Sequence, residues 1–163
     1  MTEWPIRDKT AFDQAWIEQL LKERWGSTKL ALRGRLYDAA NLPALIAGNR
    51  DGLATYRTED ESELMSLDAV TLQRGVGSAL VAALAQRLQA SGFKKLWVTT
   101  TNDNLDAMRF YQRRGFRLMR IRPEAVNACR LLKPISQIGA YGIAIRDEID
   151  LCLDLTTWHD DEA

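Results

Sequence analysis

Two glycines separated by one residue, Gly75 and Gly77, mark the first stretch whose composition suggests chemistry. Glycine has no Cβ, so a ligand can approach its backbone closely. The unpaired N–H groups and the partial positive charge at the start of a helix bind phosphate. The segment 72–78 therefore predicts a site for a phosphate-containing ligand. The helix it would open is indicated by apolar residues at spacings of three and four, namely Val76, Leu80, Ala83, Leu84 and Leu88.

Two well-known phosphate loops do not fit this spacing. The dinucleotide fingerprint requires a third glycine three residues after the second, where this chain has Leu80. The nucleoside triphosphate loop requires Gly-Lys-Ser/Thr, which the segment lacks. The spacing therefore argues against a dinucleotide-binding loop and against a nucleoside triphosphate loop.

A second pattern supplies a side chain that could donate a proton. Tyr111 follows Asn104 by seven residues, nearly two helical turns, so both side chains lie on one side of a helix. A phenol stays protonated near neutral pH and can donate a hydrogen bond to a developing anion. The alternatives are a core aromatic for Tyr111 and a helix cap for Asn104, since Asn is favoured at that position.

Taken together, the two patterns resemble the GNAT superfamily of acyl-CoA-dependent N-acyltransferases. In that family a phosphate loop, Gln/Arg-x-x-Gly-x-Gly/Ala, is followed after a helix and a strand by Asn-x-x-Ala-x-x-x-Tyr-x-x-x-Gly-Phe. Gly75 and Gly77 fit the first motif, and residues 104–116 fit the second throughout. Leu72 stands where the family usually has Gln or Arg, so a side-chain contact with phosphate from that position is lost.

The resemblance implies acetyl-CoA as co-substrate and assigns the residues that bind it. The pyrophosphate of CoA would lie on the backbone of residues 74–78. The pantetheine arm would pair with backbone groups at Leu67 and Ala69, and Asn104 would hold the arm from the other side. The full set that the resemblance implies is Leu67, Ala69, Arg74, Gly75, Val76, Gly77, Ser78, Asn104 and Tyr111.

Acyl transfer from a thioester to an amine needs three things. A proton must leave the ammonium, the oxyanion must be stabilised, and the departing thiolate must be protonated. The resemblance implies direct attack by a primary amine through a tetrahedral intermediate, with Tyr111 at the sulfur and Glu63 as general base, directly or through water. A solvated Glu63 beside the preceding acidic turn is the alternative. Neither a covalent nucleophile nor a metal is expected.

The acceptor is expected to be a small-molecule or peptide amine, whose identity the sequence does not give. In the GNAT family the first helices and the loop after them form one wall of the acceptor pocket. The resemblance therefore implies that Trp25 contacts the acceptor. Arg33 and Arg35 flank Gly34, and a guanidinium offers a planar fork of donors that suits a carboxylate. The alternative for both arginines is a solvated face.

The elements that must position these residues alternate along the chain. Asp51-Gly52 is a strong turn signal, so the strands around it should pair antiparallel. Alternation along the strand before the phosphate loop places Glu63, Met65 and Leu67 on one face. Strands are predicted at 4–9, 45–47, 53–57, 63–70, 94–100, 116–121 and 149–155, and helices at 10–25, from 76 onward, at 104–115 and at 124–133.

This order of elements predicts a mixed α/β domain. The resemblance makes it a single-domain GNAT fold, with a mixed central sheet, antiparallel front strands, two splayed central strands and flanking helices. The domain would span residues 1–163, with the cofactor-binding unit at about 63–121 and a frayed tail at 156–163.

Composition limits the partners. The 163 residues carry 22 Lys plus Arg and 22 Asp plus Glu, so neither nucleic acid nor a membrane is expected to bind. Cys129 and Cys152 are expected to be buried thiols, and no signal peptide or long apolar run is evident, which favours the cytoplasm. The sequence does not decide whether the protein forms a homodimer. The expected function is N-acetyltransferase, and the alternatives are a non-catalytic acyl-CoA-binding module or regulatory subunit and a structural domain without ligand.

Overall fold

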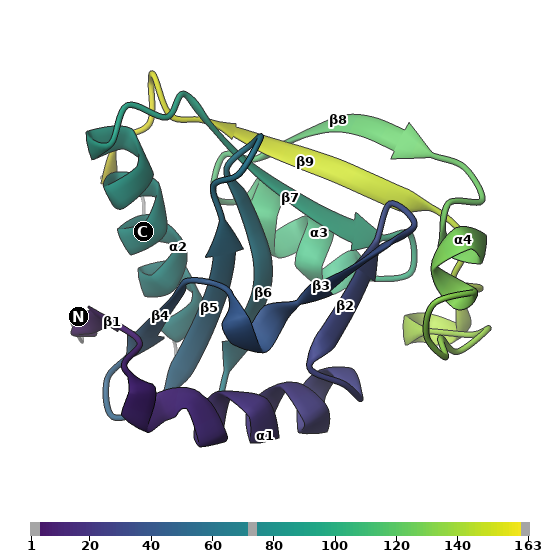
Figure 1. The fold of residues 1–163 in the computed structure, drawn as a ribbon. Coiled ribbons are helices and arrows are strands. Elements are labelled where there is room, and N and C mark those ends of the chain that lie inside the picture. Colours follow the sequence, from purple (N-terminus) through teal and green to yellow (C-terminus); the bar gives the residue numbers. More distant parts are fainter. Residues whose placement is uncertain (1–3, 72–74, 161–163) are drawn as a thin grey trace.

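The chain forms a mixed sheet whose strand order differs from the order in the sequence (Figure 1). The computed structural model describes residues 4–71 and 75–160. Neighbouring strands run antiparallel except β6 and β7, which are parallel. The predicted mixed sheet with an antiparallel front is confirmed. Its seven strands, from edge to edge, are β1 (Ile6–Asp8), β4 (Ala44–Ala47), β5 (Gly52–Arg57), β6 (Glu63–Ala69), β7 (Lys95–Thr101), β9 (Glu148–Asp154) and β8 (Arg117–Arg122).

Helices cover both faces of this sheet. α1 crosses one face, and α2 and α3 lie on the other (Figure 1). No helix within the described residues is long and apolar enough to cross a membrane. The α-helices are α1 (Gln14–Trp25), α2 (Val76–Ala90), α3 (Leu105–Gln112) and α4 (Val126–Arg130), and single 3-10 turns occur at η1 (Ala11–Asp13), η2 (Ala39–Asn41) and η3 (Ala140–Gly142).

Two apolar clusters hold the helices to the sheet, one on each face. Burying one large aliphatic side chain contributes about 1.5–3 kcal/mol, so these clusters supply most of the stabilisation. The cluster on the α1 face includes Ile17, Leu21, Ile46, Leu53 and Met65. The cluster on the α2 face includes Leu45, Leu64, Leu80, Leu84, Leu96 and Leu151.

A β-bulge in β6 changes which side chains share a face. Ser66 and Leu64 pair with successive residues of β5, so Met65 between them is an extra residue. Leu64 and Leu67 both pack in the cluster on the α2 face, whereas Met65 packs on the α1 face. The prediction that Leu67 shares a face with Glu63 and Met65 is therefore wrong, because one inserted residue shifts the alternation by one.

β6 and β7 separate soon after they meet. Within the described part of both strands they pair at Glu63 with Trp97 and at Leu64 with Val98. β7 nevertheless continues to pair with β9 as far as Thr101. The predicted splaying of the two central strands is confirmed, and a gap opens between them beyond the second pair.

A two-stranded hairpin, which the sequence analysis did not predict, stands apart from the main sheet. It consists of β2 (Lys29–Leu32) and β3 (Arg35–Asp38). Its two-residue turn, Arg33–Gly34, has positive φ at both positions, as a type I′ turn requires. The main-chain N–H of Arg33 donates to the Glu148 carboxylate at 3.1 Å, so the hairpin tip is anchored to the start of β9.

The C-terminal segment packs against α2. Gln89 donates from Nε2 to the carbonyl oxygens of Leu155 at 2.7 Å and Trp158 at 3.1 Å. The Trp158 ring packs against the cluster on the α2 face. An indole ring that covers apolar side chains stabilises the segment that carries it. The frayed tail at 156–163 stays a prediction, and residues 161–163 lie outside the described residues.

A buried carboxylate ties the N-terminal strand to the start of α1. Asp13 is 1% exposed and accepts hydrogen bonds from Arg7 Nη1 at 2.7 Å, Arg50 Nε at 3.1 Å and the Thr10 N–H at 2.8 Å. The bonds from Arg7 hold the pKa of Asp13 well below its usual value, although burial acts in the opposite direction. Asp13 therefore stabilises the fold as an anion.

Replacing Asp13 with Asn should lower the free energy of unfolding by about 1–3 kcal/mol at neutral pH, because a charged acceptor of several hydrogen bonds is lost. A depressed folded-state pKa stabilises the protein above the unfolded value of about 4, and that stabilisation is lost as the pH falls through the folded pKa. Denaturant unfolding at about pH 7 and about pH 3 measures it, and the gap between wild type and variant should narrow at the lower pH. Asp60→Asn, at an exposed turn, is the control. A gap that is constant with pH would contradict the assignment.

Candidate functional site

The first N–H groups of α2 precede its intrahelical hydrogen bonds. Gly75 has φ +95° and directly precedes the helix, in a conformation that glycine adopts at little cost. The first intrahelical bond runs from the Ala79 N–H to the Gly75 carbonyl at 2.8 Å, so the N–H groups of residues 76–78 lie ahead of the bonded turns. They lie where the sequence predicted a phosphate site, and that site stays a prediction. Leu72 and Arg74, the other loop residues of that prediction, lie outside the described residues.

An arginine that the sequence analysis did not select lies beside these donors. Arg114 donates from Nε to Ser78 Oγ at 2.9 Å, and its guanidinium carbon lies 3.5 Å from the centroid of the Phe110 ring. Burial, followed by repulsion from Arg113, lowers the pKa of Arg114. Its hydrogen bonds within the described residues go to a hydroxyl and a carbonyl rather than to a carboxylate. Arg114 is therefore a partly buried cation without a counter-charge.

The second glycine of the loop permits the contact between α2 and α3. A Cβ on Gly77 would lie 3.3 Å from the Phe110 ring and 3.8 Å from the Leu67 side chain. Gly77 thus lets two helices and β6 meet at the phosphate-binding end. Ser78 and Arg114 also border a groove of about 450 Å³ that runs along α2 toward the C-terminal residues.

Free backbone groups of β6 line the gap between β6 and β7. The Val70 N–H bonds to the Asp51 carbonyl at 2.8 Å, on the β5 side of the strand. Alternate residues of a strand direct their N–H groups to opposite edges, so those of Leu67 and Ala69 face the edge from which β7 has separated. An extended ligand arm could pair with this edge as an additional strand.

Tyr111 on α3 is buried in the cluster on the α2 face. It is 7% exposed, and the centroids of the Phe110 and Phe116 rings lie 5.2 Å and 5.1 Å from its own. Burial, followed by the charge of Asp68, raises the pKa of Tyr111, so its phenol stays protonated well above neutral pH. It is therefore a core aromatic that also retains a proton to donate.

Asn104 is the N-cap of α3. Its side-chain oxygen accepts a hydrogen bond from the Ala107 N–H at 3.2 Å. Capping uses the amide oxygen and leaves the two N–H donors of the same amide for other partners. Asn104 can therefore cap α3 and still donate hydrogen bonds to a ligand.

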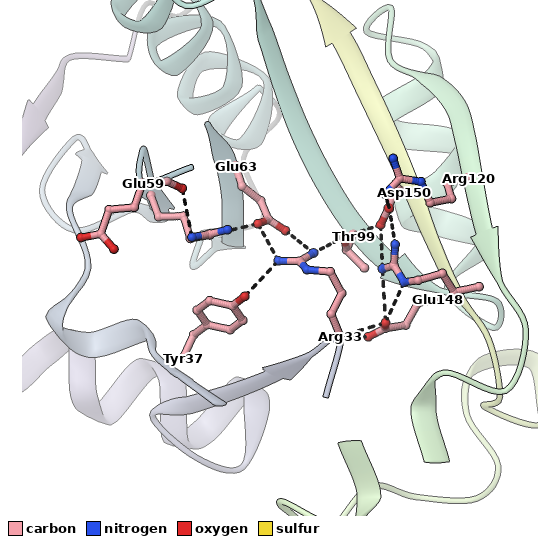
Figure 2. A network of polar contacts seen from close by, with 10 residues as sticks. Arg33, Tyr37, Glu59, Glu63, Thr99, Arg120, Glu148 and Asp150 are labelled. Carbon is pink, nitrogen blue, oxygen red and sulfur yellow. Dashed lines mark hydrogen bonds and ion pairs between the residues drawn. The ribbon is translucent and has the colours of Figure 1, made fainter. Parts of the chain in front are cut away.

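Glu63 lies where β6 and β7 diverge, and it is 3% exposed rather than solvated (Figure 2). Arg33 donates to both carboxylate oxygens of Glu63, from Nη1 and Nη2, each at 2.8 Å. Arg57 Nε adds a third bond to the carboxylate at 3.1 Å. With two guanidinium groups on it, the carboxylate has few lone pairs free to take a proton. Its role as a base stays a prediction.

The polar network continues from Glu63 across the sheet to β8 (Figure 2). Arg33 also donates to Thr99 Oγ1 at 3.0 Å, and Thr99 in turn donates to Asp150 at 2.7 Å. Arg122 of β8 reaches Asp150 at 2.8 Å and Glu148 at 3.2 Å. Charged side chains therefore join the hairpin to four strands of the main sheet.

Asp68 is a second buried carboxylate on the same face of β6, and the sequence analysis did not select it. It is 6% exposed and accepts a hydrogen bond from Trp25 Nε1 at 3.0 Å. Burial raises the pKa of Asp68, although the bond from Trp25 and the charge of Arg24 act in the opposite direction. A carboxylate with a raised pKa and one side-chain donor is a candidate proton acceptor. Trp25, predicted to line the acceptor wall, is thus hydrogen-bonded to it.

The structure brings some predicted residues together and separates others. Glu63 and Arg33 are in direct contact, whereas Arg35 is exposed, with its guanidinium carbon 5.2 Å from the centroid of the Tyr37 ring. The two residues that were missed had only weak signals in the sequence. Asp68 is the second of two carboxylates in the strand that runs into the phosphate loop, and Arg114 is an additional cation inside the second motif.

No group of three or more His, Cys, Asp or Glu side chains in residues 4–71 and 75–160 could hold a metal ion. Cys129 and Cys152 are buried and not disulfide-bonded, as predicted. The described site offers hydrogen-bond donors, two carboxylates and a phenol.

Comparison with known proteins gives a family match. A model of the acetyltransferase (GNAT) family matches residues 58–116, which include β6, the phosphate loop, α2, β7 and α3. The protein YxbD of Bacillus subtilis (strain 168), described as uncharacterized, is 34% identical over 145 residues, which cover 85% of this chain and 91% of that protein.

Solved structures agree in fold. A GNAT family acetyltransferase from Elizabethkingia anophelis, with acetyl-CoA bound, superposes with a TM-score of 0.67 at 19% identity, covering 94% of this chain and 99% of that one. An IAA acetyltransferase from Bacillus cereus ATCC 14579 superposes with a TM-score of 0.68 at 20% identity, covering 93% and 99%. At this level of identity the likeness establishes the fold alone.

Proposed function

Because this chain belongs to the GNAT family of acetyltransferases, we propose that it transfers the acetyl group of acetyl-CoA to a primary amine. The amine attacks the thioester directly, through a tetrahedral intermediate. The observation that carries the proposal is the free edge of β6, where the N–H groups of Leu67 and Ala69 face the gap left by β7. These N–H groups have no partner strand on that side, and the amide-rich pantetheine arm of CoA would supply acceptors for them.

The phosphate end of CoA fits the N-terminus of α2. The N–H groups of residues 76–78 and the helix dipole favour an anion there. Arg114 adds a cation beside the loop, where Leu72 replaces the Gln or Arg that the family usually has. A guanidinium without a counter-charge, already aligned by Ser78 and Phe110, is prepared for a phosphate.

The leaving thiolate and the oxyanion receive hydrogen bonds from opposite sides of the gap. The N–H groups of Leu67 and Ala69 are the nearest donors for the oxyanion. Tyr111, on α3, donates its proton to the departing thiolate. Its raised pKa keeps the phenol protonated near neutral pH, and the contacts with Phe110 and Phe116 hold the ring in place. Asn104 holds the pantetheine arm with its free amide N–H groups.

Two carboxylates on the α1 face of β6 are candidates for taking the proton from the ammonium. Glu63 remains our proposed base, acting through the lone pairs that Arg33 and Arg57 leave free, directly or through water. Asp68 is the second candidate, favoured by its raised pKa and by the single side-chain donor that binds it.

One observation favours the alternative function, a non-catalytic acyl-CoA-binding module or regulatory subunit. The predicted base, Glu63, is held in three hydrogen bonds with arginines, which is how a structural carboxylate would look. A single assay separates the two functions. The protein is mixed with acetyl-CoA and a diverse panel of amines, and both thiol release and thermal shift are measured. Turnover supports the enzyme, a shift without turnover supports the module, and neither would leave a structural domain.

Arg114→Gln should raise the dissociation constant of CoA about tenfold or more, because a charge-assisted bond to phosphate contributes about 1.5–3 kcal/mol. Calorimetry with CoA and with dephospho-CoA identifies the phosphate concerned. A loss seen with both ligands assigns Arg114 to the pyrophosphate, and a loss seen with CoA alone assigns it to the 3′-phosphate. Arg146→Gln, on the exposed loop before β9, is the matched control. Unchanged affinity for CoA in Arg114→Gln would remove Arg114 from the site.

Tyr111→Phe should lower turnover by roughly 10- to 10,000-fold with little change in CoA affinity, because it keeps the ring and deletes the donated proton. An acyl donor with a more acidic thiol should recover part of the loss, since its thiolate leaves with less help. The control is Tyr141→Phe, which removes the hydroxyl of an exposed tyrosine. Normal turnover in a step shown to be limited by chemistry would make Tyr111 a packing residue only.

Glu63→Gln should lower turnover most at low pH, where free amine is scarce, without a comparable loss of CoA affinity. Asp68→Asn is the matched comparison, since it also replaces a carboxylate of β6 by an amide. Glu63→Gln also removes two ion pairs, so thermal unfolding of both variants is measured to separate a loss of stability from a loss of catalysis. If turnover at low pH falls in Asp68→Asn and not in Glu63→Gln, the proton acceptor is Asp68.

A further inference from the structure

Three guanidinium groups surround a single aromatic ring on the α1 face of the sheet. The guanidinium carbons of Arg35 and Arg57 each lie 5.2 Å from the centroid of the Tyr37 ring, and that of Arg33 lies 5.8 Å from it. We call Arg33, Arg35, Arg57 and Tyr37 the arginine cluster. Figure 2 shows Arg33 and Tyr37 approaching Glu63 from the hairpin.

The arginine cluster has more positive charge than its partners neutralise. Glu63 forms ion pairs with Arg33 and Arg57, and within the described residues it is the only carboxylate that pairs with the cluster. Arg57 also bonds to Glu59, but through the main-chain oxygen at 3.1 Å. Three guanidinium groups share one ion-paired carboxylate. The charge of Asp150 also acts on Arg33, but Asp150 is itself paired with Arg120 and Arg122, so the cluster keeps a net positive charge.

Two of these cations are largely withdrawn from water. The side chains of Arg33 and Arg57 are 28% and 13% exposed. Withdrawn cations gain more from an anion than solvated ones do, because water screens the attraction less. Arg35 is exposed, and no carboxylate of residues 4–71 or 75–160 forms an ion pair with it. Its fork of donors is therefore available to a ligand.

The surplus is local, because the neighbouring charged group is balanced. Arg120 and Arg122 of β8 pair with Asp150, and Arg122 also pairs with Glu148, so two cations face two carboxylates there. The uncompensated charge is thus confined to the hairpin side of the network.

The arginine cluster lies where the acceptor must arrive. Arg33 donates to both Glu63 and Thr99. Glu63 is in one of the two β6 positions that pair with β7, and Thr99 is the first β7 residue after that pairing ends. This is the apex of the gap that receives the thioester arm in the proposed function. An acceptor that reaches the apex from the α1 face passes the hairpin, which carries Arg35.

We propose that the acceptor amine carries a carboxylate, which the arginine cluster binds, and that Arg35 is the residue that selects for it. The proposal rests on the proposed acetyl transfer and names the class of acceptor, an amino-carboxylate such as a free amino acid or a peptide with a nearby acidic group. A planar carboxylate matches a guanidinium fork in shape as well as charge.

Matched acceptors test the proposal. Each standard amino acid is compared, as acetyl acceptor, with its primary amide and with the amine that lacks the carboxyl group. For acceptors that are turned over, kcat/KM for the acid should exceed that for the amide by about 10- to 100-fold. The comparison of acid with amide is conservative, because the amine of the acid has a higher pKa than the amine of the amide, so less of it is unprotonated at a given pH.

Arg35 variants identify the residue responsible. Arg35→Gln should raise KM for the acids about tenfold with little change for the amides or in kcat, and Arg35→Lys should restore part of the loss. Lys22→Gln, which removes one positive charge from the exposed side of α1, should leave both acceptor classes unchanged. A preference for acids that survives Arg35→Gln, or equal rates with acids and amides in the wild type, would overturn the proposal.

A binding experiment keeps this inference separate from the proposed function. Amino acids and their amides are titrated into CoA-saturated protein and followed by calorimetry. Tighter binding of the acids, reduced by Arg35→Gln, supports the carboxylate site even if no amine is acetylated, in which case acetyl transfer fails alone. Binding that does not distinguish acids from amides refutes the carboxylate site, whatever the turnover.

Discussion

The structure depends on the loss of pairing between β6 and β7. Two central strands of a sheet normally satisfy each other's backbone groups, yet here pairing stops after Leu64 and Val98. The inner edge of β6 is left with N–H groups at Leu67 and Ala69 that need acceptors. β7 does not supply them, so this edge of β6 is open to solvent or to a ligand. The bulge at Met65, just past the last pair, helps to turn the strand away.

The two faces of this gap differ in chemistry. On the α2 face the gap is bordered by apolar and aromatic side chains and ends at the free N–H groups of α2, beside Arg114. On the α1 face it is bordered by carboxylates and arginines joined to the hairpin. Burying ion pairs costs desolvation that their attraction only partly offsets, so their value here lies in fixing where the hairpin tip sits. One face suits a phosphate-bearing co-substrate, and the other suits a polar acceptor.

The sequence by itself determined the features that depend on neighbours along the chain. The turn at Gly75, the helix after it and the position of Tyr111 on the same side of its helix as Asn104 follow from local conformational preference and helical period. The strands and their antiparallel front follow from apolar alternation and from the Asp51-Gly52 turn. These features are local, so a single sequence contains them in full.

Only the tertiary structure decided which distant charges meet. Glu63 is bound by Arg33, thirty positions earlier, and Asp68 by Trp25, because the hairpin and the end of α1 fold over β6. One inserted residue in β6 reversed the predicted face of Leu67, and no local pattern marks such an insertion. The environment of a carboxylate or a guanidinium is set by burial and by partners that lie far apart in the sequence. Its chemistry is therefore fixed only when the chain has folded.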